Sequence, residues 1–395
     1  MLDFKLLNKK FLVFVLLLFA FGCKKPSFKN KQSLQKKATA GPVTVVIYSI
    51  GESRIVHADM TEEKAQIGAS FYTGDRIITG TNGKVDIQAN DSSVIRIRPN
   101  TILDFSRLKL TDKGISDIAL TIHSGQMFLM FNHKQKEDNL SIFSQTAKAT
   151  TLGTIFIVEN TVNGEFVIKV IEGEVSISPR IAAIEGDNSK IITKNEQYEK
   201  LLNALSKRTT ILKKNQEISY PSKEILLSAE ILSESVIDNI IVHLSRLRIQ
   251  PKTARYTKND EQDINTILTV EPDIAKRMSE VNTELSSGQI DEKKAEKLDA
   301  ELQEIHENLT KKLNMEKAKF TEQLIQSPKK LNSLSELIKY YEKIEKIVLT
   351  NGKSVVGAII NQEENTMIIH TDKGIRRVSK KDISEVVYDY QNKLE

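Results

Sequence analysis

Short strands separated by tight turns fill the chain from residue 41 to about residue 178, and this pattern limits the fold more than any other feature. Residues 43–50 and 155–158 are β-branched and apolar, and apolar residues alternate with polar ones over 85–89. Turn signals separate the runs at Gly74-Asp75, Asn82-Gly83, Pro99-Asn100, Asn163-Gly164 and Glu172-Gly173. Such a series predicts an all-β fold, either a sandwich or a solenoid-like barrel, because the period is compatible with both.

An ordered set of motifs runs through the same segment. The motifs are YTGDRIIT (72–79), GKVDIQ (83–88), DSSVIRIRPNT (91–101), LTIHSGQM (120–127), AKATTLGTIF (147–156) and VIEGEVSI (170–177). Together and in this order they resemble the FecR domain. Two positions depart from the family pattern, since Ser92 replaces a usual glycine and Leu152 a frequent arginine. A contact that this arginine makes in relatives therefore does not carry over.

The resemblance implies a β-rich recognition module in the cell envelope. Founding members of the family are inner-membrane regulators whose periplasmic domain receives a signal from an outer-membrane transporter. Their cytoplasmic N-terminus controls a sigma factor. We find no cytoplasmic N-terminal helix and no spanning segment in this sequence, so we expect the recognition module to carry over without the sigma-factor role.

Most residues of these motifs are expected to shape turns and core. Gly74 and Gly173 suit backbone positions with positive φ, which cost a residue with a side chain about 1 kcal/mol or more. Asp75 and Asn100 can bond the backbone of their own turns.

From about residue 222 the apolar pattern changes to the helical period. Pro272 suits the first turn of a helix, Ser286-Ser-Gly288 ends it and Asp291 caps the next. The apolar faces consist of Ile225, Leu226, Ala229, Leu232 and Val236, then Ile274, Met278, Val281 and Leu285, then Leu298, Leu302, Ile305, Leu309, Leu313, Phe320 and Leu324. The polar, proline-containing residues 250–263 are expected to form a linker or an exposed loop.

The two longest of these patterns predict an antiparallel helical hairpin. Its apolar stripe is buried either within the hairpin or against the β-domain, or else it forms a coiled-coil partner site. The heptads are few and imperfect, which favours internal packing.

Strand patterns return at the C-terminus. A Ser333-x-x-Glu336 capping box begins a helix, and Asn351-Gly352 marks a hairpin. The short strands that follow, to about residue 388, resemble a small SH3-like or Sm-like barrel. Such barrels bind peptide, glycan or protein, and the fold alone assigns no ligand.

The N-terminus has the pattern of an export signal. Three lysines precede the apolar run 11–19, and Ala20-Phe21-Gly22 leads to Cys23, the only cysteine. Residues 1–22 form a signal peptide too short to span a bilayer stably. The sequence before Cys23 resembles the lipobox of bacterial lipoproteins, in the looser form typical of spirochaetes, because Ala20 and Phe21 replace the usual leucine and small residue.

The lipobox resemblance implies that Cys23 carries a diacylglycerol, that the signal is cut before it, and that the new amino group is acylated. An uncleaved anchor and an ordinary signal with a coincidental cysteine are the alternatives. Two or three acyl chains hold a protein to a membrane essentially permanently, whereas one holds it marginally. Cys23 is therefore the predicted lipidation site, and the exported body folds without a disulfide framework.

Lysines are concentrated directly after Cys23. The chain has 57 Lys and Arg against 52 Asp and Glu, a net charge of +5, and residues 23–40 hold six lysines and no acidic residue. This stretch is predicted to be a solvated tether that can also lie on anionic lipid. Nucleic acid is not expected as a partner, because no basic stripe with interleaved aromatics occurs.

No catalytic constellation is evident in the sequence. The six histidines, at positions 57, 123, 133, 243, 306 and 370, lack metal-ligand spacing, and there is no Gly-x-Ser-x-Gly elbow or phosphate loop. Tryptophan is absent, which argues against a sugar-stacking platform. We expect no catalytic residue, metal or cofactor. An envelope hydrolase is the least favoured alternative, since a carboxylate pair meets only in the fold.

The predicted organisation is a multidomain α and β protein. Its parts are a signal peptide (1–22), a tether (23–40), a FecR-like β-domain (41–180), an extension and connection (181–221), a helical region (222–330) and a helix with a small barrel (331–395). We expect a lipid-anchored, non-enzymatic recognition or scaffold protein, with the outer membrane favoured and an envelope protein as partner. The alternative is a periplasmic sensor that relays the state of an outer-membrane receptor to a separate regulator.

Overall fold

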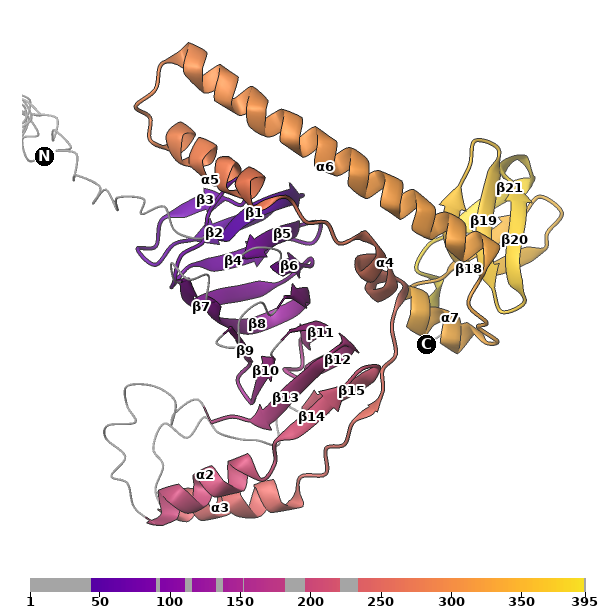
Figure 1. Ribbon diagram of the computed structural model, residues 1–395. Coiled ribbons are helices and arrows are strands. Elements are labelled where there is room, and N and C mark those ends of the chain that lie inside the picture. The colour runs from indigo at the N-terminus through magenta and orange to yellow at the C-terminus, as the bar shows by residue number, and fades with distance from the viewer. Residues whose placement is uncertain are drawn as a thin grey trace, which may run out of the picture. The chain divides into compact units, whose positions relative to one another are not determined.

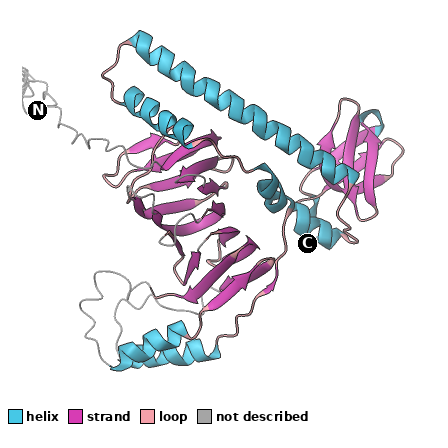
Figure 2. Ribbon diagram, viewed as in Figure 1, coloured by secondary structure: helices cyan, strands magenta, loops and turns pink. Residues whose placement is uncertain are grey.

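A computed structural model gives the fold of most of the chain (Figure 1). It describes residues 44–89, 93–110, 116–132, 138–151, 153–181, 196–220 and 234–393. Cys23 with its signal and tether, Ser92, Leu152 and the apolar positions between 225 and 232 lie outside these residues. Figure 2 shows strands over most of the first half of the chain and again at its C-terminal end, with helices dominating between them.

The first strands form two sheets that share one long strand, β8 (Ser116–Phe131). One sheet runs in the order β1 (Thr44–Ile50), β5 (Lys84–Ala89), β6 (Ser93–Ile97), β8, β11 (Thr154–Asn160), β12 (Phe166–Glu172), β15 (Gln216–Tyr220) and β16 (Lys252–Thr253). The other runs β3 (Glu62–Lys64), β2 (Ser53–Val56), β4 (Arg76–Thr79), β7 (Ile102–Leu110), β8, β9 (Asn139–Phe143), β10 (Ala147–Thr151), β13 (Glu174–Pro179) and β14 (Thr210–Lys213). Neighbouring strands are antiparallel except β8 and β9.

Strand β8 passes from one sheet to the other at Gly125. Residues 116–124 pair with β7, and residues 125–131 pair with β11. Gly125 has φ +92°, and a Cβ there would lie 2.3 Å from Thr101 Oγ1 and 2.5 Å from Thr101 Cα. Only glycine fits this backbone position without strain or displacement of the neighbouring strand.

Apolar residues from both sheets form one core. Phe105 and Leu120 come from one sheet and Phe156 and Ile95 from the other. The rings of Phe71 and Phe105 stack with their centroids 4.3 Å apart. The prediction of an all-β region is therefore confirmed, and its strands lie in two sheets joined through β8.

The expected turn roles of the motif residues are also confirmed. Gly74 and Gly173 have φ +95° and +84°, and Asn100 has φ +57°. The Asp75 carboxylate accepts a hydrogen bond of 2.8 Å from the Tyr72 backbone N–H, within the same turn.

Two helices accompany the extension of the sheets. β14 and β15 add to the two sheets, and helix α2 (Glu196–Ser206) was not predicted. It packs on α3 (Glu234–Arg246) through Leu201, Leu205, Ile237, Ile240 and Leu244.

The predicted helical hairpin is present as α5 (Pro272–Ser286) and α6 (Glu292–Gln326). Pro272 is the first residue of α5, and the Asp291 side chain caps α6 by accepting from the Lys294 N–H at 2.9 Å. No helix of the described segments is both long and apolar enough to cross a membrane.

The α6 stripe packs internally at three successive places, as the imperfect heptads favoured. Leu298 and Leu302 lie with α5 against Val45 and Ile47 of β1. Further along, Leu313 contacts Tyr48 and Leu268. Finally, Phe320 and Leu324 pack against the C-terminal module, by which we mean α7 and the five strands after it.

The C-terminal module consists of α7 (Leu334–Tyr341) and a five-stranded sheet. The strands are β17 (Glu345–Leu349), β18 (Ser354–Gln362), β19 (Thr366–Thr371), β20 (Gly374–Ser379) and β21 (Ile383–Val387), in the order β20-β19-β18-β17-β21. The capping serine, Ser333, accepts from the Glu336 N–H. No pairing among the described residues joins β20 to β21, so the sheet is open and its closure into a barrel stays a prediction.

We expect Gly125→Ala to lower the free energy of unfolding by at least about 3 kcal/mol, because positive-φ strain adds to a backbone clash with Thr101. Gly352→Ala is the matched control, since Gly352 has φ +78° but open space around its Cβ position. It should cost about 1–2 kcal/mol. Urea denaturation followed by circular dichroism measures both, and equal losses would contradict the assigned role of Gly125.

Candidate functional site

Residues 250–263, expected to form a linker or an exposed loop, instead lead into a buried helix, α4 (Lys258–Thr266). Thr257 and Asp260 make a complete capping box at its start. Asp260, Asp263 and Thr266, spaced three apart, lie on one helix face and are buried. The polar composition suggested exposure, but these polar side chains meet charged partners from strands far away in the sequence.

Arg96 of β6 is the centre of this contact and is completely buried. Its Nε and Nη2 donate to the two carboxylate oxygens of Asp86, each at 2.8 Å. Its Nη1 donates to Asp263 and to Thr266 Oγ1, both at 3.0 Å, and its Nη2 also donates to the Thr266 carbonyl at 3.1 Å. All five donors of the guanidinium are thereby used, which is the condition for burying such a charge.

Arg98, Lys84 and Lys169 complete what we call the α4 network. Arg98 donates to Asp263 at 2.6 Å and to Asp260 at 2.9 Å. Lys84 donates to Asp263 at 2.9 Å and Lys169 to Asp260 at 2.8 Å. Burial alone would raise the pKa of Asp263, but the positive charges of Arg98, Lys84 and Arg96 outweigh it and hold that pKa well below its ordinary value. The helix is therefore held to the β-domain by ion pairs between side chains.

α4 also contacts the C-terminal module and Lys329, which follows α6. Glu261 accepts from Lys329 Nζ at 2.7 Å and from the Tyr340 hydroxyl at 2.5 Å. Asn259 donates to Glu342 at 2.6 Å. Burial and the hydrogen bond to Glu261 raise the pKa of Tyr340. One nine-residue helix thus touches both the β-domain and the C-terminal module.

A cleft of about 1120 Å³ opens beside α4, and we call it the α4 cleft. Its walls come from the ends of β6 and β11, the bend of β8, α4, and Glu342 after α7. The lining residues used below are Arg98, Gln126, Glu159, Asn160, Asp263 and Glu342. The cleft borders the α4 network, so a ligand in it would lie next to the charged side chains that hold α4.

Glu159 differs from the other carboxylates near the network. Its contact is a hydrogen bond from Gln126 Nε2 at 3.3 Å, and no ion pair is formed with it among the described residues. Burial raises the pKa of Glu159, Asp260 and Glu342 add to the rise, and Lys169 and Arg98 oppose it. This carboxylate is therefore poorly compensated and faces a cleft.

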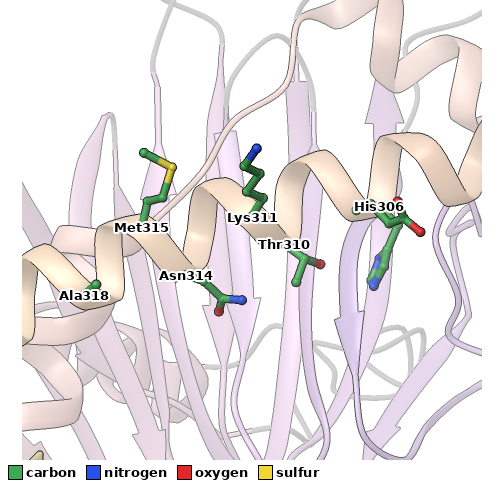
Figure 3. A pocket seen from close by; sticks show the side chains of 7 residues that line it. His306, Thr310, Lys311, Asn314, Met315 and Ala318 are labelled. Atoms are coloured by element: carbon green, nitrogen blue, oxygen red, sulfur yellow. The ribbon is translucent and has the colours of Figure 1, made fainter. Parts of the chain in front are cut away.

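A second, shallower hollow of about 610 Å³ lies along α6. Figure 3 shows Thr310 and Asn314 on one side of the helix and Lys311 and Met315 on the opposite side. His306 stacks with Tyr48, with ring centroids 5.9 Å apart. All the lining residues come from this one helix, so the hollow brings no separate elements together.

The described histidines have different partners, and His133 lies outside the described residues. His57 lies 3.1 Å from Asp75, His123 lies 2.8 Å from Asp104, and His370 shares a buried hydrogen bond of 2.7 Å with Tyr341. In the part of the chain that the structure describes, no group of three His, Cys, Asp or Glu side chains could hold a metal ion. Cys23, the predicted lipidation site, lies outside that part.

We expect Asp263→Asn to lower the free energy of unfolding by about 3–5 kcal/mol, because it leaves Arg98, Arg96 and Lys84 short of a buried negative charge. Glu316→Gln, which removes an exposed pair with Lys319, is the control and should cost less than about 1 kcal/mol. Urea denaturation measures both. Similar small losses would show that the network is not stabilising.

Acid should weaken the same attachment. A carboxyl whose pKa is lowered by folding adds stability above its unfolded pKa of about 3.9, and this stability is lost as the pH falls through the folded value. The free energy of unfolding should therefore fall from about pH 4 downwards, and less steeply in Asp263→Asn. Urea denaturation between pH 7 and pH 2.5 tests this, and parallel curves for the two proteins would contradict it.

Comparison with known proteins identifies a family only for the β-domain. Residues 75–176 match the family described as FecR protein. Two crystal structures of a candidate anti-sigma factor from Parabacteroides distasonis are similar over 48% of this chain, at 11% identity and with TM-scores of 0.30 and 0.29. The chain covers 64% and 63% of those structures, less than two thirds of their length. A search of curated proteins gives no match. The predicted FecR-like domain is thus confirmed over residues 75–176.

Proposed function

We propose that this protein is a non-enzymatic sensor whose FecR-like β-domain binds a partner and whose α4 transmits the bound state to the C-terminal module. The observation that carries the proposal is the double attachment of α4. Asp260 and Asp263 tie it to the β-domain, and Glu261 ties it to Lys329 and Tyr340. A shift of α4 on one side therefore changes contacts on the other.

The α4 cleft supports this role, because its lining includes a residue of the α4 network and a residue that follows α7. Asp263 lines the cleft and belongs to the network, and Glu342 lines it from the C-terminal module. Coupling between two sites needs an element whose arrangement both sites affect. In our proposal α4 is that element.

The proposal places the protein at the cell envelope, held by an acylated Cys23 through the lysine-rich tether 23–40, with the outer membrane favoured. The C-terminal module then acts as an SH3-like binding unit for a separate regulator. The order of its five strands and the helical turn η3 (Lys380–Asp382) before the last one support that likeness.

A scaffold is the second candidate function. It uses the same two binding modules, and the open C-terminal sheet with its unpaired edge strands favours it. A scaffold would hold its partners regardless of ligand, whereas a sensor responds to the state of one of them. Transmission of a change from the β-domain to the C-terminal module through α4 distinguishes a sensor from a scaffold.

We expect Asp263→Asn to increase amide hydrogen exchange both in β5 and β6 and in residues 334–349 of the C-terminal module, because α4 loses its attachment and carries the change across. Asp117→Asn is the control. It removes a charge pair with Arg107 inside the β-domain, where neither residue lines the α4 cleft, and should change exchange only locally. Changes confined to the β-domain in both variants would favour the scaffold.

Crosslinking in intact cells tests the partner. We expect the wild type to recover an outer-membrane transporter or its regulator and Cys23→Ala to lose it, because the anchor places the β-domain at the membrane. Recovery of peptidoglycan fragments, of other lipoproteins or of nothing specific would contradict a signalling role.

A further inference from the structure

Most of the residues that line the α4 cleft are polar, and the lining is nearly free of aromatic rings. No Phe, Tyr or Trp lines it, and its single aromatic ring is the imidazole of His123. Sugars and bases are usually held by stacking on aromatic faces, so this lining is poorly suited to either. Its polar groups suit a ligand that is recognised by hydrogen bonds and charge.

Two carboxylates reach the cleft from different elements. Glu159 is at the end of β11, and Glu342 follows α7 with φ +66°. Their mutual repulsion contributes to the raised pKa of Glu159, and Glu342 accepts a hydrogen bond of 2.6 Å from the uncharged Asn259 amide and forms no ion pair among the described residues. A cation placed between them would relieve this repulsion.

Two residues that line the cleft each have one buried polar atom without a hydrogen-bond partner in the described structure. These atoms are Nη2 of Arg98, a donor, and Oδ1 of Asn160, an acceptor. Both side chains are more than nine-tenths buried and held in place: Arg98 by Asp260 and Asp263, and Asn160 through bonds from its Nδ2 to the Ile122 and His123 carbonyls. A peptide unit carries both an acceptor and a donor, and can match such a pair.

We propose that the α4 cleft binds an extended polypeptide segment that carries a Lys or Arg side chain. The cationic group lies between Glu159 and Glu342, and the peptide backbone bonds Arg98 and Asn160. This assignment rests on the proposed function and names the chemistry of its partner. The cleft volume of about 1120 Å³ exceeds that of most small-molecule pockets, which are roughly 300–1,000 Å³.

The test uses three pools of acetylated, amidated heptapeptides that are randomised except at the central position, which is lysine, norleucine or glutamate. Purified protein is immobilised, and retained peptide is quantified by mass spectrometry. We expect retention of the lysine pool to exceed that of the norleucine pool on the order of tenfold, and that of the glutamate pool by more. Glu159→Gln and Glu342→Gln should each reduce this preference.

Glu172→Gln is the matched control, because Glu172 is an exposed glutamate of the same β-domain outside the cleft. It should keep the preference, and circular dichroism confirms that all three variants are folded. Equal retention of the three pools, or a lysine preference that survives Glu159→Gln, would overturn the proposal. Displacement of the peptide by a tetramer of N-acetylglucosamine would likewise overturn it in favour of a glycan site.

Failure of the peptide-binding proposal and failure of the sensor proposal give different experimental results. If only the ligand assignment is wrong, the lysine preference is absent, and Asp263→Asn still changes amide hydrogen exchange in the C-terminal module. Unchanged exchange in the C-terminal module, with peptide binding retained, would instead remove the sensor function.

Discussion

The buried contact between Arg96, Arg98 and the α4 aspartates is the constraint on which the arrangement of this protein depends. Arg98 and Asp263 are 165 positions apart in the sequence, yet they form a 2.6 Å bond between two almost completely buried side chains. A buried charge that loses its partner is strongly destabilising, so the β-domain with both arginines in place requires α4 beside it. Because Glu261 on the same helix binds Lys329 and Tyr340, this one requirement also fixes where the C-terminal module is attached.

The regions that were predicted from the sequence are those in which local patterns decide the structure. Alternating strands and Gly or Asn turns indicated β1–β13, Pro272 and Asp291 marked the starts of α5 and α6, and Asn351-Gly352 marked a hairpin. Helix α4 was missed, because its polar residues resemble a linker until the arginines that they meet are known. The two arginines in the otherwise apolar strand pattern, Arg96 and Arg98, were the available signal, since a buried arginine needs a carboxylate partner. The α4 cleft could not be predicted, because its walls come from segments between residues 84 and 342 that meet only in the fold.

The α4 cleft is built only in part from the residues that match the FecR family. The family match covers residues 75–176, which supply the β6, β8 and β11 walls of the cleft. The remaining walls come from α4 and Glu342, which lie outside the matched residues. A FecR domain without these additions would present a different surface, so the ligand of this chain need not be that of its relatives.

The bend of β8 at Gly125 has a mechanical consequence for such a protein. One half of the strand is hydrogen-bonded into each sheet, so neither sheet can slide over the other without breaking a ladder of backbone bonds. Both sheets also hold one shared core. The β-domain therefore resists shear and behaves as a single stiff body, and any displacement that follows binding must occur in the elements attached to it. Of these, α4 is held by ion pairs and hydrogen bonds from side chains of the sheet and by no ladder of backbone bonds, so it can shift without breaking either sheet.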